Sequence, residues 1–157
     1  MDLPFLTWTE EFAVGHESLD AEHHRLIEII NDVHAAECAE QSPSQMRPLL
    51  GTLNRMATDH FQHEDSILNR INFGLLPSGV DTRAFLRAVV DAAIGEHTAN
   101  HGRSLHQLNT IVRDFYAGLG SIEQDLSLDL KAWFIDHAAK HDAPLKEVFR
   151  TLSGRAV

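Results

Sequence analysis

Hydrophobic residues recur at intervals of three and four over four long stretches of the chain, which is the pattern of amphipathic helices. These stretches predict helices over about residues 18–39, from about 44 to between 70 and 74, from 81 or 82 to just before Gly118, and through Leu126 to about Arg150. The sequence shows no convincing strand-like alternation and no Asn-Gly hairpin signal. The chain is therefore predicted to be all-α.

Residues that flank these stretches suggest where the helices begin and end. Ser18 is predicted as the N-cap of the first helix, because a serine side chain can accept a hydrogen bond from the free amides of the first turn. Proline disfavours helix in the residue before it, so the first helix should end before Pro43. Gly95 is a candidate break in the third helix, and Pro144 is a candidate kink in the fourth.

Four amphipathic helices joined by short turns bury their hydrophobic faces most simply as an antiparallel, up-down four-helix bundle. The sequence has no internal repeat or linker, so we expect a single domain over residues 1–157. Residues 1–17 lack a helical period and are predicted to lie against the bundle as an apolar arm. The hydrophobic residues of this arm are Phe5, Trp8, Phe12 and Val14.

Composition limits the partners and the location. Acidic residues outnumber basic ones by 23 to 13, which gives a formal charge of −10 with histidine neutral. This charge repels phosphate backbones and anionic lipids, so we expect neither nucleic acid nor a membrane as partner. The single cysteine, Cys38, excludes an internal disulfide, and the N-terminus has no signal-peptide pattern. A cytoplasmic location is expected.

Polar residues that interrupt the hydrophobic faces point to a metal site. The chain has eleven histidines. Two pairs of donors are spaced four residues apart, so each pair shares one helix face, and every predicted helix directs at least one donor inward. Burying such groups without a partner costs about 1–3 kcal/mol each or more, which a bound metal ion can offset. The donors are His23, His60 with Glu64, His97 with His101, and His137.

Spacing leaves two alternatives for a further donor near the end of the fourth helix. His141 follows His137 by four residues and shares its helix face. Asp142 follows by five residues, which places it about 140° beyond one full turn of an α-helix. Spacing alone therefore favours His141, which would add an imidazole and no second carboxylate.

These motifs resemble the hemerythrin family over most of the chain. The resemblance rests on Trp8, Val14-Gly15, Asp20-Ala-Glu-His23, His60-Phe-Gln-His-Glu64, His97-Thr-Ala-Asn-His101, and Trp133-Phe-Ile-Asp-His137 followed by Asp142. It implies that one iron ion is bound by His97, His101 and His137, that a second is bound by His23 and His60, and that Glu64 and Asp142 bridge both. His141 is then expected at the surface or as a hydrogen-bonding neighbour of a ligand.

The implied cofactor is a pair of iron ions joined by an oxo or hydroxo bridge. The ion with three histidines has all its positions filled, whereas the ion with two histidines keeps one position open. The family resemblance implies that O2 binds reversibly at this position, with small anions as further ligands. Nitrogen and oxygen donors suit iron and leave zinc and manganese as imperfect competitors. Ferritin-like centres use Glu-x-x-His twice, and that motif does not occur in this sequence.

The resemblance implies an oxygen carrier, store or sensor, and two other functions remain open. An open iron beside a second redox iron is also typical of a di-iron peroxidase or a nitric-oxide-processing enzyme. No dedicated acid or base stands outside the ligand set in the sequence. A third alternative is an oxygen-responsive regulatory module that moves a helix or the arm.

Two departures from the family pattern stand out. The family has aliphatic residues where this chain has Phe134 and Ala138, so Ala138 is expected to open the wall of the oxygen site and to favour autoxidation. Glu64 and His97 are 33 residues apart, which is longer than the family norm. We expect an extension near residues 73–90 that lengthens the bundle, forms a homodimer or effector contact, or completes the core through Phe85, Leu86, Val89 and Val90.

The remaining candidates receive structural interpretations. Trp133 is expected in the core, and Cys38 has no evident task. The other histidines are expected at the surface or at an edge of the bundle, and they are His16, His24, His34, His63 and His106.

Overall fold

Four α-helices and two short helical turns make up the part of the chain that the computed structural model describes, which is residues 3–74, 82–118, 125–142, 145–147 and 149–150. For residues 71–74 and 82–91 only the course of the helical backbone is described. The elements in chain order are η1 (Glu10–Phe12), α1 (Glu17–Cys38), α2 (Pro43–Gly74), α3 (Thr82–Ala117), α4 (Leu126–Ile135) and η2 (Asp136–His141).

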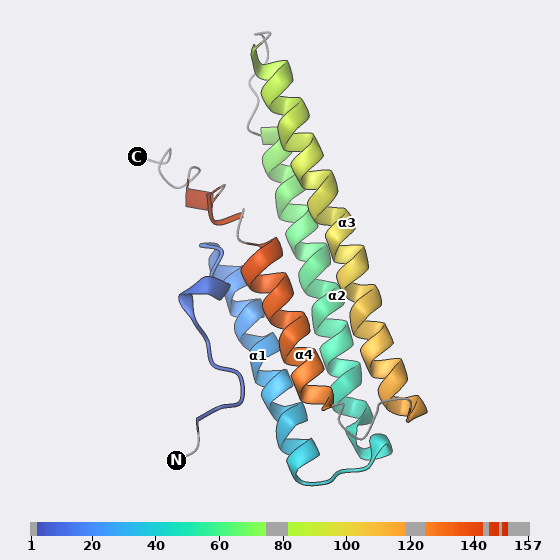
Figure 1. Ribbon diagram of the computed structural model, residues 1–157. Coiled ribbons are helices and arrows are strands. Elements are labelled where there is room, and N and C mark those ends of the chain that lie inside the picture. The colour runs from blue at the N-terminus through green and yellow to red at the C-terminus, as the bar shows by residue number, and fades with distance from the viewer. Residues whose placement is uncertain (1–2, 75–81, 119–124, 143–144, 148, 151–157) are drawn as a thin grey trace.

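The helices run alternately up and down around one core (Figure 1). Helix α1 packs against α2 and α4, and α3 packs against the same two neighbours. No strand occurs among the described residues. The prediction of an all-α, antiparallel up-down four-helix bundle is confirmed.

Two predicted helix starts were displaced by one or two residues. Helix α1 begins at Glu17 with His16 as N-cap, so Ser18 lies in the first turn and is not the cap. Helix α2 begins at Pro43. The first amide of a helix has no partner within the helix, so the amide hydrogen that proline lacks costs nothing at this position. Ser42 and Gln45 form a reciprocal capping box: the Gln45 amide donates to Ser42 Oγ at 3.3 Å, and the Ser42 amide donates to Gln45 Oε1 at 2.8 Å.

The candidate break at Gly95 is wrong. Helix α3 runs without interruption from Thr82 to Ala117, because neighbouring residues hold the helical hydrogen bonds and the intrinsic cost of an internal glycine is only about 1 kcal/mol.

The fourth helix differs most from its prediction. Regular α-helix ends at Ile135, and the chain continues as the π-helical turn η2 from Asp136 to His141. Helical structure returns at residues 145–147 and 149–150. The candidate kink at Pro144 lies outside the described residues.

The core is formed by the hydrophobic faces that the sequence pattern predicts. Leu26, Ile30, Leu53, Leu108 and Phe134 are each fully buried. The N-terminal arm lies against this core as expected, and its buried residues are Leu6, Phe12 and Val14.

The extension between Glu64 and His97 lies in the two helices themselves. Both α2 and α3 continue past the ends of α1 and α4 (Figure 1). The side chains of Phe85, Leu86, Val89 and Val90 lie outside the described residues, so their predicted contact remains a prediction. Within the described residues, no helix is long and apolar enough to cross a membrane.

Candidate metal centre

All seven predicted ligands meet inside the bundle. Their exposed fractions are 8% or less, and four different helical segments supply them. The donor atoms fall into two groups, each with its ligand atoms within 4.8 Å of one another. Asp142 belongs to both groups. The groups are His23, His60, His137 and Asp142, and Glu64, His97, His101 and Asp142.

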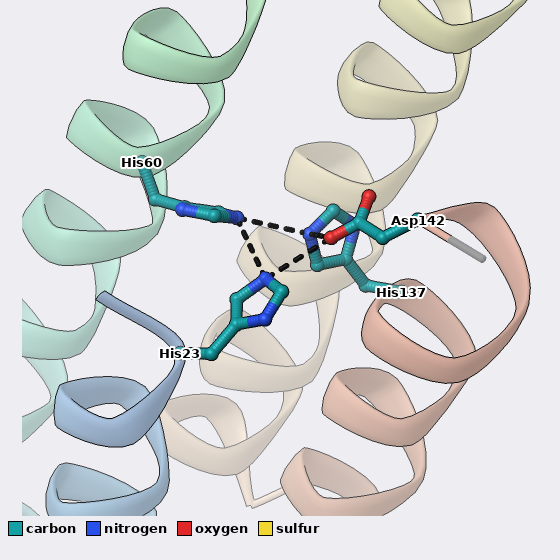
Figure 2. Close-up of side chains that lie close together, drawn as sticks. All are labelled: His23, His60, His137 and Asp142. Carbon is teal, nitrogen blue, oxygen red and sulfur yellow. Dashed lines mark hydrogen bonds and ion pairs between the residues drawn. The ribbon is translucent and has the colours of Figure 1, made fainter. Parts of the chain in front are cut away.

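Three imidazole nitrogens converge in the first group (Figure 2). His60 Nε2 lies 3.1 Å from His23 Nε2 and 3.1 Å from His137 Nε2. Asp142 Oδ2 lies 3.0 Å from the Nε2 atoms of both His23 and His137. Such mutually facing acceptor atoms are typical of side chains arranged around a cation.

The second group is centred on Glu64. Glu64 Oε1 lies 2.8 Å from His97 Nε2, and Glu64 Oε2 lies 3.3 Å from His101 Nε2. Asp142 Oδ1 lies 3.6 Å from His97 Nε2. Helices α2 and α3 therefore supply most of this group.

Both carboxylates span the two groups. Glu64 Oε2 is also 3.3 Å from His60 Nε2, and the two oxygens of Asp142 face different groups. This arrangement fits the bridging positions that the family resemblance implies for Glu64 and Asp142.

His137 lies between the groups. The resemblance pairs it with His97 and His101, but its Nε2 atom is closest to His60 and Asp142. Its ring centroid is 5.3 Å from that of His60 and 5.7 Å from that of His101. The division of the histidines between two ions remains a prediction.

The π-helical turn brings Asp142 into the centre. The Asp142 amide donates to the His137 carbonyl oxygen at 3.1 Å, which is the i to i+5 bond of a π-helix. His141, the alternative favoured by spacing alone, is 33% exposed and pairs with Asp136 at 3.2 Å. The structure thus places Asp142, and not His141, among the predicted ligands.

Three groups that sequence reasoning missed contact the Nδ1 atoms of three predicted histidine ligands. Glu22 Oε2 lies 2.8 Å from His60 Nδ1, and Asp65 Oδ1 lies 2.8 Å from His101 Nδ1. The carbonyl oxygen of Phe12 lies 2.7 Å from His23 Nδ1. By accepting hydrogen bonds at Nδ1, such groups direct Nε2 toward a metal.

The positions of Glu22 and Asp65 in the sequence, each next to a predicted ligand, gave a signal that they lie near the centre. Glu22 directly precedes His23 and Asp65 directly follows Glu64, yet each contacts a ligand on the neighbouring helix. Glu22 also contacts His63 Nδ1 at 2.6 Å, so His63 lies at the edge of the centre.

Electrostatics at the centre favour ionised carboxylates. Burial acts to raise the pKa of Asp142, but the facing His137 and His23 hold this pKa well below its usual value. Glu64 behaves alike: burial and the charge of Asp142 act to raise its pKa, but His101 and His97 outweigh both and leave it lowered.

The imidazoles divide into two kinds. Burial lowers the pKa of His137 and so favours its neutral form. Burial acts in the same direction on His23 and His97, but the carboxylates of Asp142 and Glu64 respectively outweigh it, and the pKa of each imidazole is raised.

Unsatisfied buried atoms test whether a metal fits. Among the described residues, five buried side-chain atoms lack a hydrogen-bond partner. Four of them face the interior of the two groups and lie 3.0 to 3.6 Å from a side-chain atom of another predicted metal ligand. Buried polar atoms are rarely left unpaired, and cations would satisfy these four. The five atoms are Glu64 Oε2, His101 Nε2, His137 Nδ1, Asp142 Oδ1 and Asp142 Oδ2.

Aromatic rings enclose the centre. Phe61 stacks on His101 with ring centroids 4.6 Å apart and meets the edge of His137 at 4.7 Å. Phe134 lies 5.9 Å from His23. Trp133 is buried as expected, and its indole N–H donates to the Ser104 carbonyl at 2.8 Å.

The other histidines have structural partners or face solvent. His24 stacks on Trp8, His34 stacks on Phe5, and His106 is exposed. Cys38 is exposed, with its Sγ 3.6 Å from His34 Nε2.

A four-helix bundle with a buried histidine and carboxylate centre defines a class of helical metalloprotein scaffolds. Residues 14–149 match the family model described as Hemerythrin HHE cation binding domain. The chain therefore belongs to the hemerythrin family. The histidine and carboxylate groups fit the binding of two iron ions in this family's scaffold.

Known proteins of this family resemble the chain at moderate identity. Bacteriohemerythrin of Methylococcus capsulatus is 21% identical over 141 residues, which cover 89% of this chain and 93% of that protein. Myohemerythrin of Riftia pachyptila is 33% identical over 70 residues, which cover 45% of this chain and about half, 52%, of that protein.

Solved structures support the same fold. A crystal structure of a hemerythrin mutant superposes with a TM-score of 0.69 at 19% identity, and covers 94% of this chain and 98% of that one. A second mutant crystal structure gives the same TM-score at 20% identity.

Proposed function

We propose that this chain is a non-haem di-iron protein that binds O2 reversibly. The observation that carries the proposal is the convergence of seven buried donors, from α1, α2, α3 and the η2 segment with its C-cap Asp142, into two groups linked by carboxylates. Membership of a family described as cation-binding supports it.

The donor set favours iron. All the facing atoms are imidazole nitrogens or carboxylate oxygens, and none is sulfur. In the proposed assignment Glu64 and Asp142 would each hold both ions. His97, His101 and His137 complete one ion, and His23 and His60 the other.

Two bound ferrous ions would supply the two electrons that reversible capture of O2 requires. In the proposed assignment, O2 would bind at the ion held by the two histidines His23 and His60. The chain's own residues orient and enclose the centre. Glu22, Asp65 and the Phe12 carbonyl accept hydrogen bonds from Nδ1, and in the neutral ring this selects the tautomer whose Nε2 carries no proton. Phe61 and Phe134 cover the centre with apolar surface that limits access of water.

Metal analysis combined with optical spectra tests the proposal. The protein is loaded with ferrous iron without air, and spectra are recorded before air, after air and after removal of O2. We expect two irons per chain and a visible charge-transfer band that appears with air and disappears when O2 is removed. The zinc-loaded protein is the control, since zinc has no redox chemistry and should give no band.

Two outcomes would contradict the proposal. Fewer than two irons per chain would exclude the di-iron centre. Sustained consumption of peroxide or nitric oxide, without a reversible oxygen adduct, would favour a di-iron enzyme instead.

A further inference from the structure

The N-terminal arm, residues 3–16, is held against α1 by a pair of hydrogen bonds between the Leu6 backbone and the Asn31 side-chain amide. The Leu6 amide donates to Asn31 Oδ1 at 2.8 Å, and Asn31 Nδ2 donates to the Leu6 carbonyl at 2.9 Å. Lys131 of α4 donates to the Phe5 carbonyl at 2.9 Å. The arm runs alongside α1 in Figure 1. These bonds use backbone groups of the arm, so they hold its course and not only its side chains.

Ring stacking adds to this attachment. Phe5 stacks on His34 with ring centroids 4.0 Å apart, and Trp8 stacks on His24 at 3.7 Å. His24, Asn31 and His34 are spaced by seven and three residues, which places them on one face of α1. This face of the helix therefore serves to hold the arm.

The end of the arm reaches the metal centre. The carbonyl oxygen of Phe12 accepts a hydrogen bond from His23 Nδ1 at 2.7 Å, and both residues are buried. Phe12 belongs to η1, which packs against η2, and Lys146 donates to the Glu10 carbonyl at 2.8 Å. The arm thus contacts a ligand and both sides of the segment that carries Asp142.

We propose that the arm is a positioning element of the centre: Asn31 holds the arm so that the Phe12 carbonyl fixes His23 with Nε2 toward the cluster. This inference rests on the proposed metal binding. Because coupling between two events is reciprocal, a docked arm strengthens metal binding at His23, and bound metal strengthens docking of the arm.

The test compares two asparagine variants. Asn31→Ala removes the two bonds to Leu6 without touching a ligand. Asn54→Ala is the matched control, since Asn54 donates to Asn109 Oδ1 at 3.0 Å between α2 and α3, away from the arm. Lys131→Met gives a second way to loosen the arm if Asn31→Ala folds poorly. Folding of each variant is checked by circular dichroism.

Release of ferrous iron to a colorimetric chelator, without air, is the first measurement. Loss of an outer partner of a metal ligand costs about 10- to 100-fold in affinity. Asn31 acts one step further away, so we expect about tenfold faster release of one of the two ions in Asn31→Ala and unchanged release in Asn54→Ala.

Hydrogen exchange at the Leu6 and Val14 amides of the parent is the second measurement. These amides should exchange several-fold more slowly with iron than without it. A purely structural arm would not respond to the metal.

Equal release rates in Asn31→Ala and the parent, or equal acceleration in both asparagine variants, would overturn the inference while leaving the di-iron proposal intact. Arm exchange that does not depend on iron would also overturn it. A parent that binds no iron would instead refute the proposed function, and the inference with it.

Discussion

The backbone amide of Asp142 donates a hydrogen bond to the carbonyl oxygen of His137, five residues earlier, at 3.1 Å. A π-helical turn contains more residues than an α-helical turn, so residues five apart approach the same face. This bond explains how both side chains reach one centre despite a spacing that an α-helix would separate.

Asp142→Asn is expected to lower the iron content from two ions per chain to one or fewer, because an amide is a poor substitute for a bridging carboxylate. Iron is measured by elemental analysis after anaerobic loading. His141→Ala is the matched control and should keep two ions, since His141 pairs with Asp136 at the edge. Loss of iron in His141→Ala, with normal loading of Asp142→Asn, would reverse the assignment of the two residues.

His101→Ala is expected to empty or weaken the ion site that includes His97. The lost imidazole also leaves Asp65 without its 2.8 Å partner. His106→Ala removes an exposed histidine from the same helix and should have no effect. Full two-iron loading of His101→Ala would contradict the ligand set.

Ala138→Ile is expected to prolong the lifetime of the oxygenated protein, because added bulk would restrict water near the open position. Ala138 is fully buried, so the larger side chain should also cost about 1–3 kcal/mol of stability through overpacking. Ala132→Ile, at an exposed site of α4, is the control for the substitution itself. The lifetime is followed by the decay of the visible band, and an unchanged or shorter lifetime would count against this hypothesis.

Iron loading is expected to raise the melting temperature, since a ligand that binds the folded state alone stabilises it. At a free concentration 100 times the dissociation constant the gain is about 2.7 kcal/mol. For a chain of this size that corresponds to a rise of roughly 5 to 11 °C. Thermal melts with and without a chelator check it, and identical melting temperatures would argue against a metal site.

The rise in melting temperature that iron produces should increase with pH. In chelator-stripped protein, the raised pKa values of His23 and His97 give stability that is complete below 6.5 and is lost as the pH rises through those values. The lowered pKa of Asp142 gives stability above 3.8 that is lost as the pH falls. His137, whose pKa is lowered, contributes in the opposite sense to His23, because its stability is lost below 6.5.

Metal ions bind deprotonated imidazoles. Metal binding should therefore strengthen as rising pH deprotonates His23 and His97 and weakens their ion pairs with Asp142 and Glu64. The difference in melting temperature between loaded and stripped protein should therefore grow from about pH 5.5 to about pH 8. A difference that shrinks over this range would contradict the ion pairs.

The helices of the bundle could be predicted from hydrophobic period, and the predicted 18–39 helix differs from α1 by one residue at each end. The predicted break at Gly95 was wrong, because an internal glycine costs a helix only about 1 kcal/mol of stability, which the rest of the long helix α3 offsets. Donors spaced by four residues, such as His97 and His101, also followed from sequence, since α-helical geometry fixes their common face.

Asp142 could not be predicted from helical geometry, because a π-helical turn leaves no clear mark in the sequence. Only the family resemblance selected this residue over His141. The hydrogen bonds that Glu22 and Asp65 accept from His60 and His101 were missed for a different reason. Each joins two helices, and the relative rotation of two helices depends on tertiary packing.

Ligands that extend from His23 to Asp142 also set the order in which the molecule can mature. During synthesis, a chain that has not yet completed its last helix lacks both a histidine and a carboxylate of the centre, so it can hold iron only weakly. In the proposed assignment, tight metal binding therefore requires the chain through Asp142, and a chain cut before η2 should be unable to retain the ions.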